Sequence, residues 1–241
     1  MRASGHMTDA AVAPAQRLAH LGCILFDLDG TLIDSVALIL SSFRHATAAV
    51  LGQALPDEVL LENVGMPLHA QFIRMAPAQA DELLRVYREH NAEHHDAMVR
   101  EYPGTEETLQ ELERRGHRLG VVTSKSAPVM RRGLELFGLE RFFEVCVSSD
   151  DVTAHKPDPQ PVAIAAELLG CAAAESMYVG DSPHDMASAI AAGAVSVAAL
   201  WGAFPPEAVL APGPDFALAS IRDLPALLDG DVEHFTVGDA G

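Results

Sequence analysis

Lysine is nearly absent from this chain of 241 residues, which contains 14 arginines but only two lysines, Lys125 and Lys156. Acidic residues outnumber basic ones by 34 to 16, and the formal net charge is −18. Binding to nucleic acid or anionic lipid without sequence specificity needs a concentrated basic patch. No run of lysine and arginine supplies one, so we expect neither nucleic acid nor a membrane as a partner.

Cysteine is also scarce, and Cys23, Cys146 and Cys171 are too far apart in sequence to form a CxxC pair. Three cysteines at such spacings favour free thiols in a reducing compartment. The first residues lack the basic and apolar segments of a secretory signal, and residues 5–7 resemble a cloning scar. The uncharged stretch 186–206 is mostly alanine broken by glycine and serine, which predicts a helix and a strand rather than a membrane span. We therefore expect a cytoplasmic protein.

The pattern of apolar residues predicts alternating strands and helices. Cys23-Ile24-Leu25-Phe26 is a short apolar run of the kind found in buried parallel strands. From Val36 to Glu101 the apolar spacing is that of amphipathic helices. After Tyr102-Pro103-Gly104 the alternation resumes. Strands are expected at 119–123, 143–147, 177–180 and 194–200, and helices at 105–115, 128–137, 160–169, 185–192 and 223–228.

Strands that alternate with helices in this way indicate βαβ units on a parallel sheet. The first strand belongs with those that follow the helical segment. The predicted fold class is therefore α/β, with a Rossmann-like parallel sheet core and an inserted all-helical cap. We assign residues 21–33 and 103–229 to the core and 34–102 to the cap. Residues 1–20 and 230–241 are expected to be terminal tails.

Four clusters of polar residues follow predicted strands. They are Asp27-Leu28-Asp29-Gly30-Thr31, Thr123-Ser124-Lys125, His155-Lys156-Pro157-Asp158-Pro159 and Gly180-Asp181-Ser182-Pro183-His184-Asp185. The carboxyl ends of parallel strands meet at the edge of the sheet where ligands bind. Aspartates gathered there would repel one another unless a hard divalent cation such as Mg²⁺ neutralised them. Both lysines of the chain lie in these clusters, where their ammonium groups can neutralise a phosphoryl group.

The four ordered clusters resemble the motifs of the haloacid dehalogenase-like superfamily of phosphohydrolases with a helical cap. The resemblance covers about residues 22–228. It implies that Asp27 is the nucleophile that forms an aspartyl-phosphate and that Asp29 is the general acid–base. By the same resemblance, Mg²⁺ binds the Asp27 carboxylate, the Asp29 backbone carbonyl and Asp181, and Asp185 supports that shell.

The resemblance also implies residues that hold the phosphoryl group. Thr123 would donate a hydrogen bond to its oxygens, and Lys156 would offset the charge on it and on Asp27. Further substrate contacts are expected from Thr31, Ser124 and Lys125 in the core and from Arg74 and His94 in the cap.

Structural roles stay open for some of these residues. Thr123 could cap the next helix, Asp185 could cap its own, and Lys125 could be a solvated surface charge. In the cap, His90 and His94 have the i, i+4 spacing of a zinc pair. No third ligand supports zinc there, so we expect a polar cap face instead.

We expect a small phosphorylated molecule as the substrate, and two branches of the superfamily are candidates for its identity. Residues 87–102 and Asp150-Asp151-Val152 are similar to bacterial cytosolic pyrophosphatases of the PpaX type. Leu32-Ile33-Asp34-Ser35 and Gly65-Met66-Pro67-Leu68 also resemble phosphoglycolate phosphatases. We expect inorganic pyrophosphate, with phosphoglycolate or another small phosphomonoester as the alternative.

Single residues argue against two other activities that this fold supports. A phosphonatase needs a cap lysine, and residues 36–101 contain none. A haloacid dehalogenase would need neither Asp29 nor Asp181. A phosphomutase and a non-catalytic phosphate-binding protein are remote alternatives, and the sequence does not indicate an oligomeric state.

Overall fold

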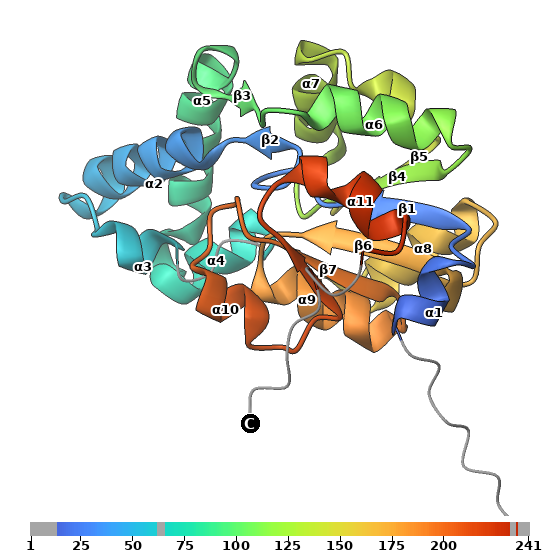
Figure 1. The fold of residues 1–241 in the computed structure, drawn as a ribbon. Coiled ribbons are helices and arrows are strands. Elements are labelled where there is room, and N and C mark those ends of the chain that lie inside the picture. Colours follow the sequence, from blue (N-terminus) through green and yellow to red (C-terminus); the bar gives the residue numbers. More distant parts are fainter. Residues whose placement is uncertain (1–13, 62–65, 232–234, 236–241) are drawn as a thin grey trace, which may run out of the picture.

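The computed structural model describes residues 14–61, 66–231 and 235 (Figure 1). Its core is a six-stranded sheet in the order β5-β4-β1-β6-β7-β8, and every neighbouring pair is parallel. The strands are β1 (Cys23–Phe26), β4 (Arg118–Val122), β5 (Val145–Val147), β6 (Ser176–Gly180), β7 (Val195–Ala199) and β8 (Phe216–Leu218). The predicted α/β class with a parallel sheet is confirmed. All four residues of β1 are buried, because β1 has a strand on each side and helices on both faces.

Alternate residues of β1 point to opposite faces of the sheet, and each face has its own hydrophobic cluster. Ile24 and Phe26 pack in the cluster that includes residues of α6 (Thr105–Arg114), α7 (Ala127–Leu136) and α11 (Leu224–Leu228). Cys23 and Leu25 pack in the cluster that includes residues of α8 (Gln160–Leu168) and α9 (Pro183–Ala192). The sheet is therefore the middle layer of three (Figure 1).

Between β1 and α6 the chain forms the predicted helical cap, on the left of Figure 1. Its elements are α2 (Val36–Leu51), α3 (Asp57–Leu61), α4 (Leu68–Met75), the 3₁₀ turn η1 (Pro77–Gln79) and α5 (Ala80–Met98). The cap has a separate hydrophobic cluster, in which the rings of Phe43, Phe72 and Tyr87 lie 4.8 to 5.8 Å apart. Two short antiparallel strands, β2 (Ile33–Asp34) and β3 (Arg100–Glu101), join the cap to the core.

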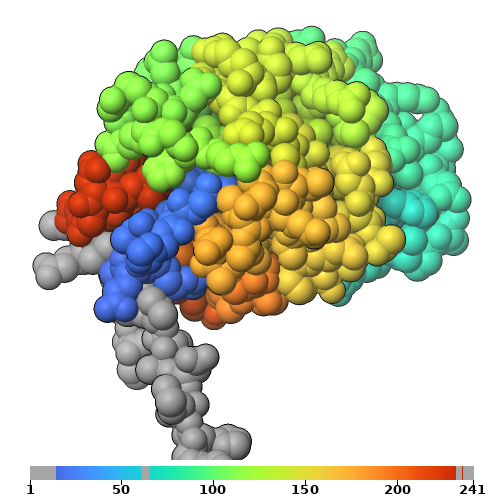
Figure 2. Space-filling model, turned by 90° about the vertical axis from the view of Figure 1, so that its right-hand side faces the viewer, coloured from blue at the N-terminus to red at the C-terminus, as the bar shows by residue number. Residues whose placement is uncertain are grey.

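The structure differs from expectation at both ends of the chain. A short helix, α1 (Pro14–Leu18), lies within the expected tail 1–20, and Arg17 donates to the backbone oxygen of Ala174 (3.3 Å). Figure 2 shows this N-terminal segment, in blue, against later parts of the chain. In the expected tail 230–241, Phe235 packs on the core and its carbonyl accepts from the Ala217 N–H (2.8 Å). The expected cloning scar at residues 5–7 lies outside the described residues.

Among the short elements that were not predicted are α3, α10 (Pro206–Leu210) and β8. Each has five residues or fewer, too short for a periodic pattern to show. The uncharged stretch 186–206 forms most of α9, all of β7 and the loop beyond it. Within the described part of the chain, no helix has the length and hydropathy needed to cross a membrane.

Candidate active site

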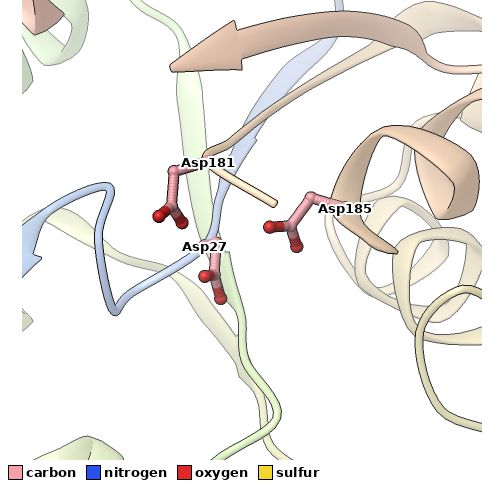
Figure 3. A group of neighbouring side chains, drawn as sticks. All are labelled: Asp27, Asp181 and Asp185. Carbon is pink, nitrogen blue, oxygen red and sulfur yellow. The ribbon is translucent and has the colours of Figure 1, made fainter. Parts of the chain in front are cut away.

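Two neighbouring strands, β1 and β6, and helix α9 bring three aspartates to one edge of the sheet. Asp27 directly follows β1 and its N–H donates to the Val179 oxygen of β6 (2.9 Å), while Asp181 directly follows β6. Asp185 lies in the first turn of α9. One carboxylate oxygen from each of the three aspartates lies within 4.8 Å of the other two (Figure 3). The strand order thus brings together carboxylates that are up to 158 positions apart in sequence.

Lys156 is buried among these carboxylates. Its Nζ donates to Oδ1 of Asp27 (2.9 Å), Oδ1 of Asp185 (2.6 Å) and the Tyr178 hydroxyl (2.7 Å). Burial alone lowers the pKa of Lys156, but the charges of Asp185 and Asp27 outweigh burial, and its pKa is raised. The ammonium group therefore stays charged and fixes the carboxylate of Asp27.

Both oxygens of Asp185 accept hydrogen bonds. Oδ1 accepts from Lys156 and from the Tyr178 hydroxyl (2.9 Å), and Oδ2 accepts from the N–H (3.0 Å) and hydroxyl (2.6 Å) of Ser182. Burial raises the pKa of Asp185, but Lys156 and these hydrogen bonds reverse the shift and lower it. Asp185 therefore positions Lys156 and also caps α9, one of the roles that the sequence left open.

Asp181 differs from its neighbours because, within the described residues, no cationic side chain is bonded to it. Its Oδ2 accepts from the Ala203 N–H (2.8 Å) and its Oδ1 from the Thr31 hydroxyl (3.4 Å). Burial, together with the charges of Asp185 and Asp27, raises its pKa well above the ordinary value. Burial also raises the pKa of Asp27 to about 7, although Lys156 opposes this shift. A metal ion between Asp27 and Asp181 would remove this repulsion, so the donor set fits a cation.

The side chain of Asp29 is 20% exposed, whereas the other three aspartates are buried. Its Oδ1 accepts from Lys125 Nζ (3.0 Å) and from the Ser35 hydroxyl. The Thr123 hydroxyl accepts from the Lys125 N–H (3.2 Å), so it closes the turn before α7. Lys125 and Ser35 thus hold the carboxylate that the sequence marks as an acid–base group.

A cavity of about 690 Å³ lies above these residues, between core and cap. Its core wall includes Asp27, Asp29, Thr123, Ser124, Lys125, Lys156 and Asp181. Its cap wall includes Leu68, His69 and Gln71 of α4 and Tyr87, Arg88, Asn91, Ala92 and His95 of α5. A small ligand in this cavity would touch both parts of the protein.

A family profile described as haloacid dehalogenase-like hydrolase matches residues 24–199. This chain belongs to the haloacid dehalogenase-like hydrolases. It is 40% identical over 211 residues to the pyrophosphatase PpaX of Bacillus pumilus (strain SAFR-032), covering 88% of this chain and 98% of that protein. It is 38% identical over 208 residues to the pyrophosphatase PpaX of Bacillus mycoides (strain KBAB4), covering 86% and 97%.

Solved structures of similar fold have lower sequence identity. A predicted phosphatase from Clostridium acetobutylicum has a TM-score of 0.78 and 26% identity, covering 87% of this chain and 99% of that one. A predicted phosphoglycolate phosphatase from Haemophilus somnus 129PT has a TM-score of 0.76 and 25% identity, covering 86% and 98%. Both likenesses extend over at least 86% of this chain.

In this haloacid dehalogenase-like hydrolase, three expected substrate contacts do not line the cavity. Thr31 is fully buried and its hydroxyl donates to Asp181 instead. Arg74 is exposed and contacts the sulfur of Met66 (3.6 Å). The ring of His94 stacks on that of His90, with centroids 4.2 Å apart. The geometry therefore supports a substrate contact for Ser124 but not for these three.

Three histidines of the cap stack their rings on one another. His45 joins His90 and His94, with its ring centroid 4.6 Å from that of His90. One ring nitrogen of His90 bonds to the Ser42 hydroxyl (3.1 Å), and one of His94 bonds to the His90 carbonyl (2.9 Å). Within the described ranges, the three aspartates are the sole group of three or more His, Cys, Asp or Glu with metal-binding spacing.

Sequence reasoning missed Tyr178, Ser35 and Arg88. Tyr178 is inside an apolar strand, where its hydroxyl gives no separate signal. Ser35 follows the turn motif directly, so its place beside Asp29 could have been suggested from proximity in sequence. Arg88 shares a face of α5 with Asn91 and His95, but the spacing does not show that this face turns toward the cavity.

Proposed function

We propose that this hydrolase is a Mg²⁺-dependent pyrophosphatase in which Asp27 is the nucleophile. The observation that carries the proposal is the pairing of Asp27 with Lys156 beside Asp181, a buried carboxylate to which no described cationic side chain is bonded. We choose pyrophosphate as the substrate because the PpaX pyrophosphatases are 40% and 38% identical to this chain. Phosphoglycolate is the second candidate, favoured by the structural likeness to the predicted phosphoglycolate phosphatase.

The metal would be held by the carboxylates of Asp27 and Asp181 and by the backbone carbonyl of Asp29. When bound, Mg²⁺ supplies a Lewis acid that neutralises charge on the transferring phosphoryl oxygens. Lys156 supplies a second positive charge: it donates to Oδ1 of Asp27 and favours the ionised form of that carboxylate.

The reaction would proceed in two displacements. First, a carboxylate oxygen of Asp27 bonds to phosphorus while the bond to the bridging oxygen breaks, and Asp29 gives its proton to the departing phosphate. Second, Asp29 takes a proton from water, the water oxygen bonds to phosphorus, and the bond to Asp27 breaks. Inorganic phosphate leaves and the Asp27 carboxylate is restored. Lys125 and Ser35 orient Asp29 for both proton transfers.

Turnover of pyrophosphate, phosphoglycolate and p-nitrophenyl phosphate tests the proposal. We expect pyrophosphate to have the highest kcat/KM and EDTA to abolish all three activities. Asp27→Asn should lower kcat by at least about a thousandfold, because an amide is nearly isosteric but cannot attack phosphorus. Asp57→Asn, in an exposed ion pair of the cap, is the matched control and should keep wild-type activity.

Two results would contradict the proposal. A higher kcat/KM for phosphoglycolate would assign the alternative substrate. An Asp27→Asn protein with more than about a tenth of wild-type kcat would show that Asp27 is not the nucleophile.

A further inference from the structure

Helix α5 turns one narrow stripe of its surface toward the cavity. Arg88, Asn91, Ala92 and His95 follow one another at spacings of three, one and three residues, which places them on one face of a helix. Asn91 and Ala92 are uncharged, and His95 bonds to Asp96 (2.8 Å). Arg88 is therefore the permanent positive charge of this stripe.

Arg88 has no carboxylate within reach along its own helix. The positions three and four residues before and after it are Arg85, Leu84, Asn91 and Ala92. Arg85, one turn earlier, differs: its guanidinium binds Glu82, three residues before it (2.6 Å), and Glu89, four residues after it (2.7 Å). Within the described residues Arg88 makes no hydrogen bond or ion pair, although acidic residues outnumber basic ones by 34 to 16 in this chain.

The other lysine and arginine side chains that line the cavity are already paired. Lys156 binds Asp27 and Asp185, and Lys125 binds Asp29. Arg132 of α7 binds Asp96 (2.9 Å) and the Ala92 carbonyl (2.8 Å). Arg88 is thus the cation of the described cavity lining that has no carboxylate partner, and it lies on the wall opposite the catalytic aspartates.

We propose that Arg88 determines specificity by binding the anionic leaving group of the substrate. This inference rests on the proposed function, in which the leaving group is a phosphate. Pyrophosphate carries charge at both ends: the transferred end meets Lys156, and the departing end meets Arg88. A guanidinium can donate two parallel hydrogen bonds to phosphate oxygens, which a neutral side chain cannot replace. The leaving group of p-nitrophenyl phosphate offers Arg88 no full charge.

Arg88→Met and its matched control Arg85→Met test the assignment. The measured quantity is the ratio of kcat/KM for pyrophosphate to kcat/KM for p-nitrophenyl phosphate. We expect Arg88→Met to lower this ratio by about 10- to 100-fold, the effect of losing hydrogen bonds to a charged group. Arg88→Lys should recover part of the loss, and Arg85→Met should leave the ratio unchanged.

Binding can be measured without turnover. In the Asp27→Asn background, calorimetric titration with methylenediphosphonate and Mg²⁺ should show weaker binding when Arg88 is also replaced by Met. The role of Arg88 would be overturned if the kcat/KM ratio of Arg88→Met stayed within threefold of wild type. It would also be overturned if Arg85→Met lowered the ratio as much as Arg88→Met does. Neither result would contradict pyrophosphate hydrolysis by the wild type. A wild-type protein that cleaves p-nitrophenyl phosphate but not pyrophosphate would instead overturn the proposed function.

Discussion

Two glycines, Gly30 and Gly202, make room for the side chain of Asp181 because they have no side chain of their own. A Cβ added to Gly30 would lie 2.1 Å from Oδ2 of Asp181, and one added to Gly202 would lie 2.2 Å from its Cβ. Gly30 also has a φ of +79°, a left-handed conformation that other residues adopt only at a cost. The position of Asp181 therefore depends on residues that have no side chain of their own.

Gly30→Ala should abolish Mg²⁺-dependent turnover, because the new methyl group and Asp181 cannot occupy the same space. Gly213→Ala is the control: Gly213 has the same φ of +79° but no atom within 4 Å of an added Cβ. We expect Gly213→Ala to lose about 1–2 kcal/mol of stability in urea unfolding and to keep its kcat. If Gly30→Ala kept the kcat and the Mg²⁺ requirement of the wild type, turnover would not depend on Asp181 in the position that the structure gives it.

At the scale of elements, the cap has its own hydrophobic cluster and is joined to the core by the β2–β3 ribbon. Helices α2 and α5 pack along each other and place Phe43 against Tyr87, with ring centroids 4.8 Å apart. Phe72 of α4 completes the cluster and is fully buried. This packing sets which face of α5 turns toward the cavity.

Phe72→Ala should destabilise the cap by about 3–5 kcal/mol, the usual cost of removing a buried phenyl ring. Hydrogen exchange should become faster for the amides of α2, α4 and α5, while the amides of the sheet keep their protection. Ile73→Ala, at the neighbouring position where the side chain is 47% exposed, should change little. An equal acceleration across the sheet would mean that cap and core unfold as one unit.

At the scale of the whole molecule, a formal charge of −18 opposes the approach of an anionic substrate. Capture must then depend on positive groups inside the cavity and on the metal. Interactions between distant exposed charges are screened at moderate ionic strength, whereas contacts inside the cavity are screened less. Salt should therefore weaken the repulsion more than the binding.

Raising KCl from low to moderate concentration, at constant free Mg²⁺, should leave kcat/KM for pyrophosphate steady or up to about twofold higher. The less highly charged p-nitrophenyl phosphate is the comparison and should respond less. A steep loss of pyrophosphate activity alone would indicate long-range attraction and contradict this account.

The alternation of strands and helices, the inserted helical cap and the gathering of the aspartates were predictable from the sequence. Apolar runs mark buried strands, and the polar residues that follow such runs must meet at one edge of a parallel sheet. The fold class and the superfamily are confirmed. The catalytic and metal-binding roles of Asp27, Asp29 and Asp181 stay predictions, although the structure brings all three to one cavity.

The tertiary structure alone decided how the cap meets the core. Helical spacing shows that Arg74, Arg88 and His94 lie on amphipathic helices, but not which face of each helix turns toward the cavity. That rotation depends on the packing of Phe43, Phe72 and Tyr87, which are far apart in sequence. The bonds of Tyr178 to Lys156 and Asp185 likewise join separate elements. The secondary structure of residues near one another in sequence can be read from local patterns. Contacts between separate elements form only when the hydrophobic clusters pack.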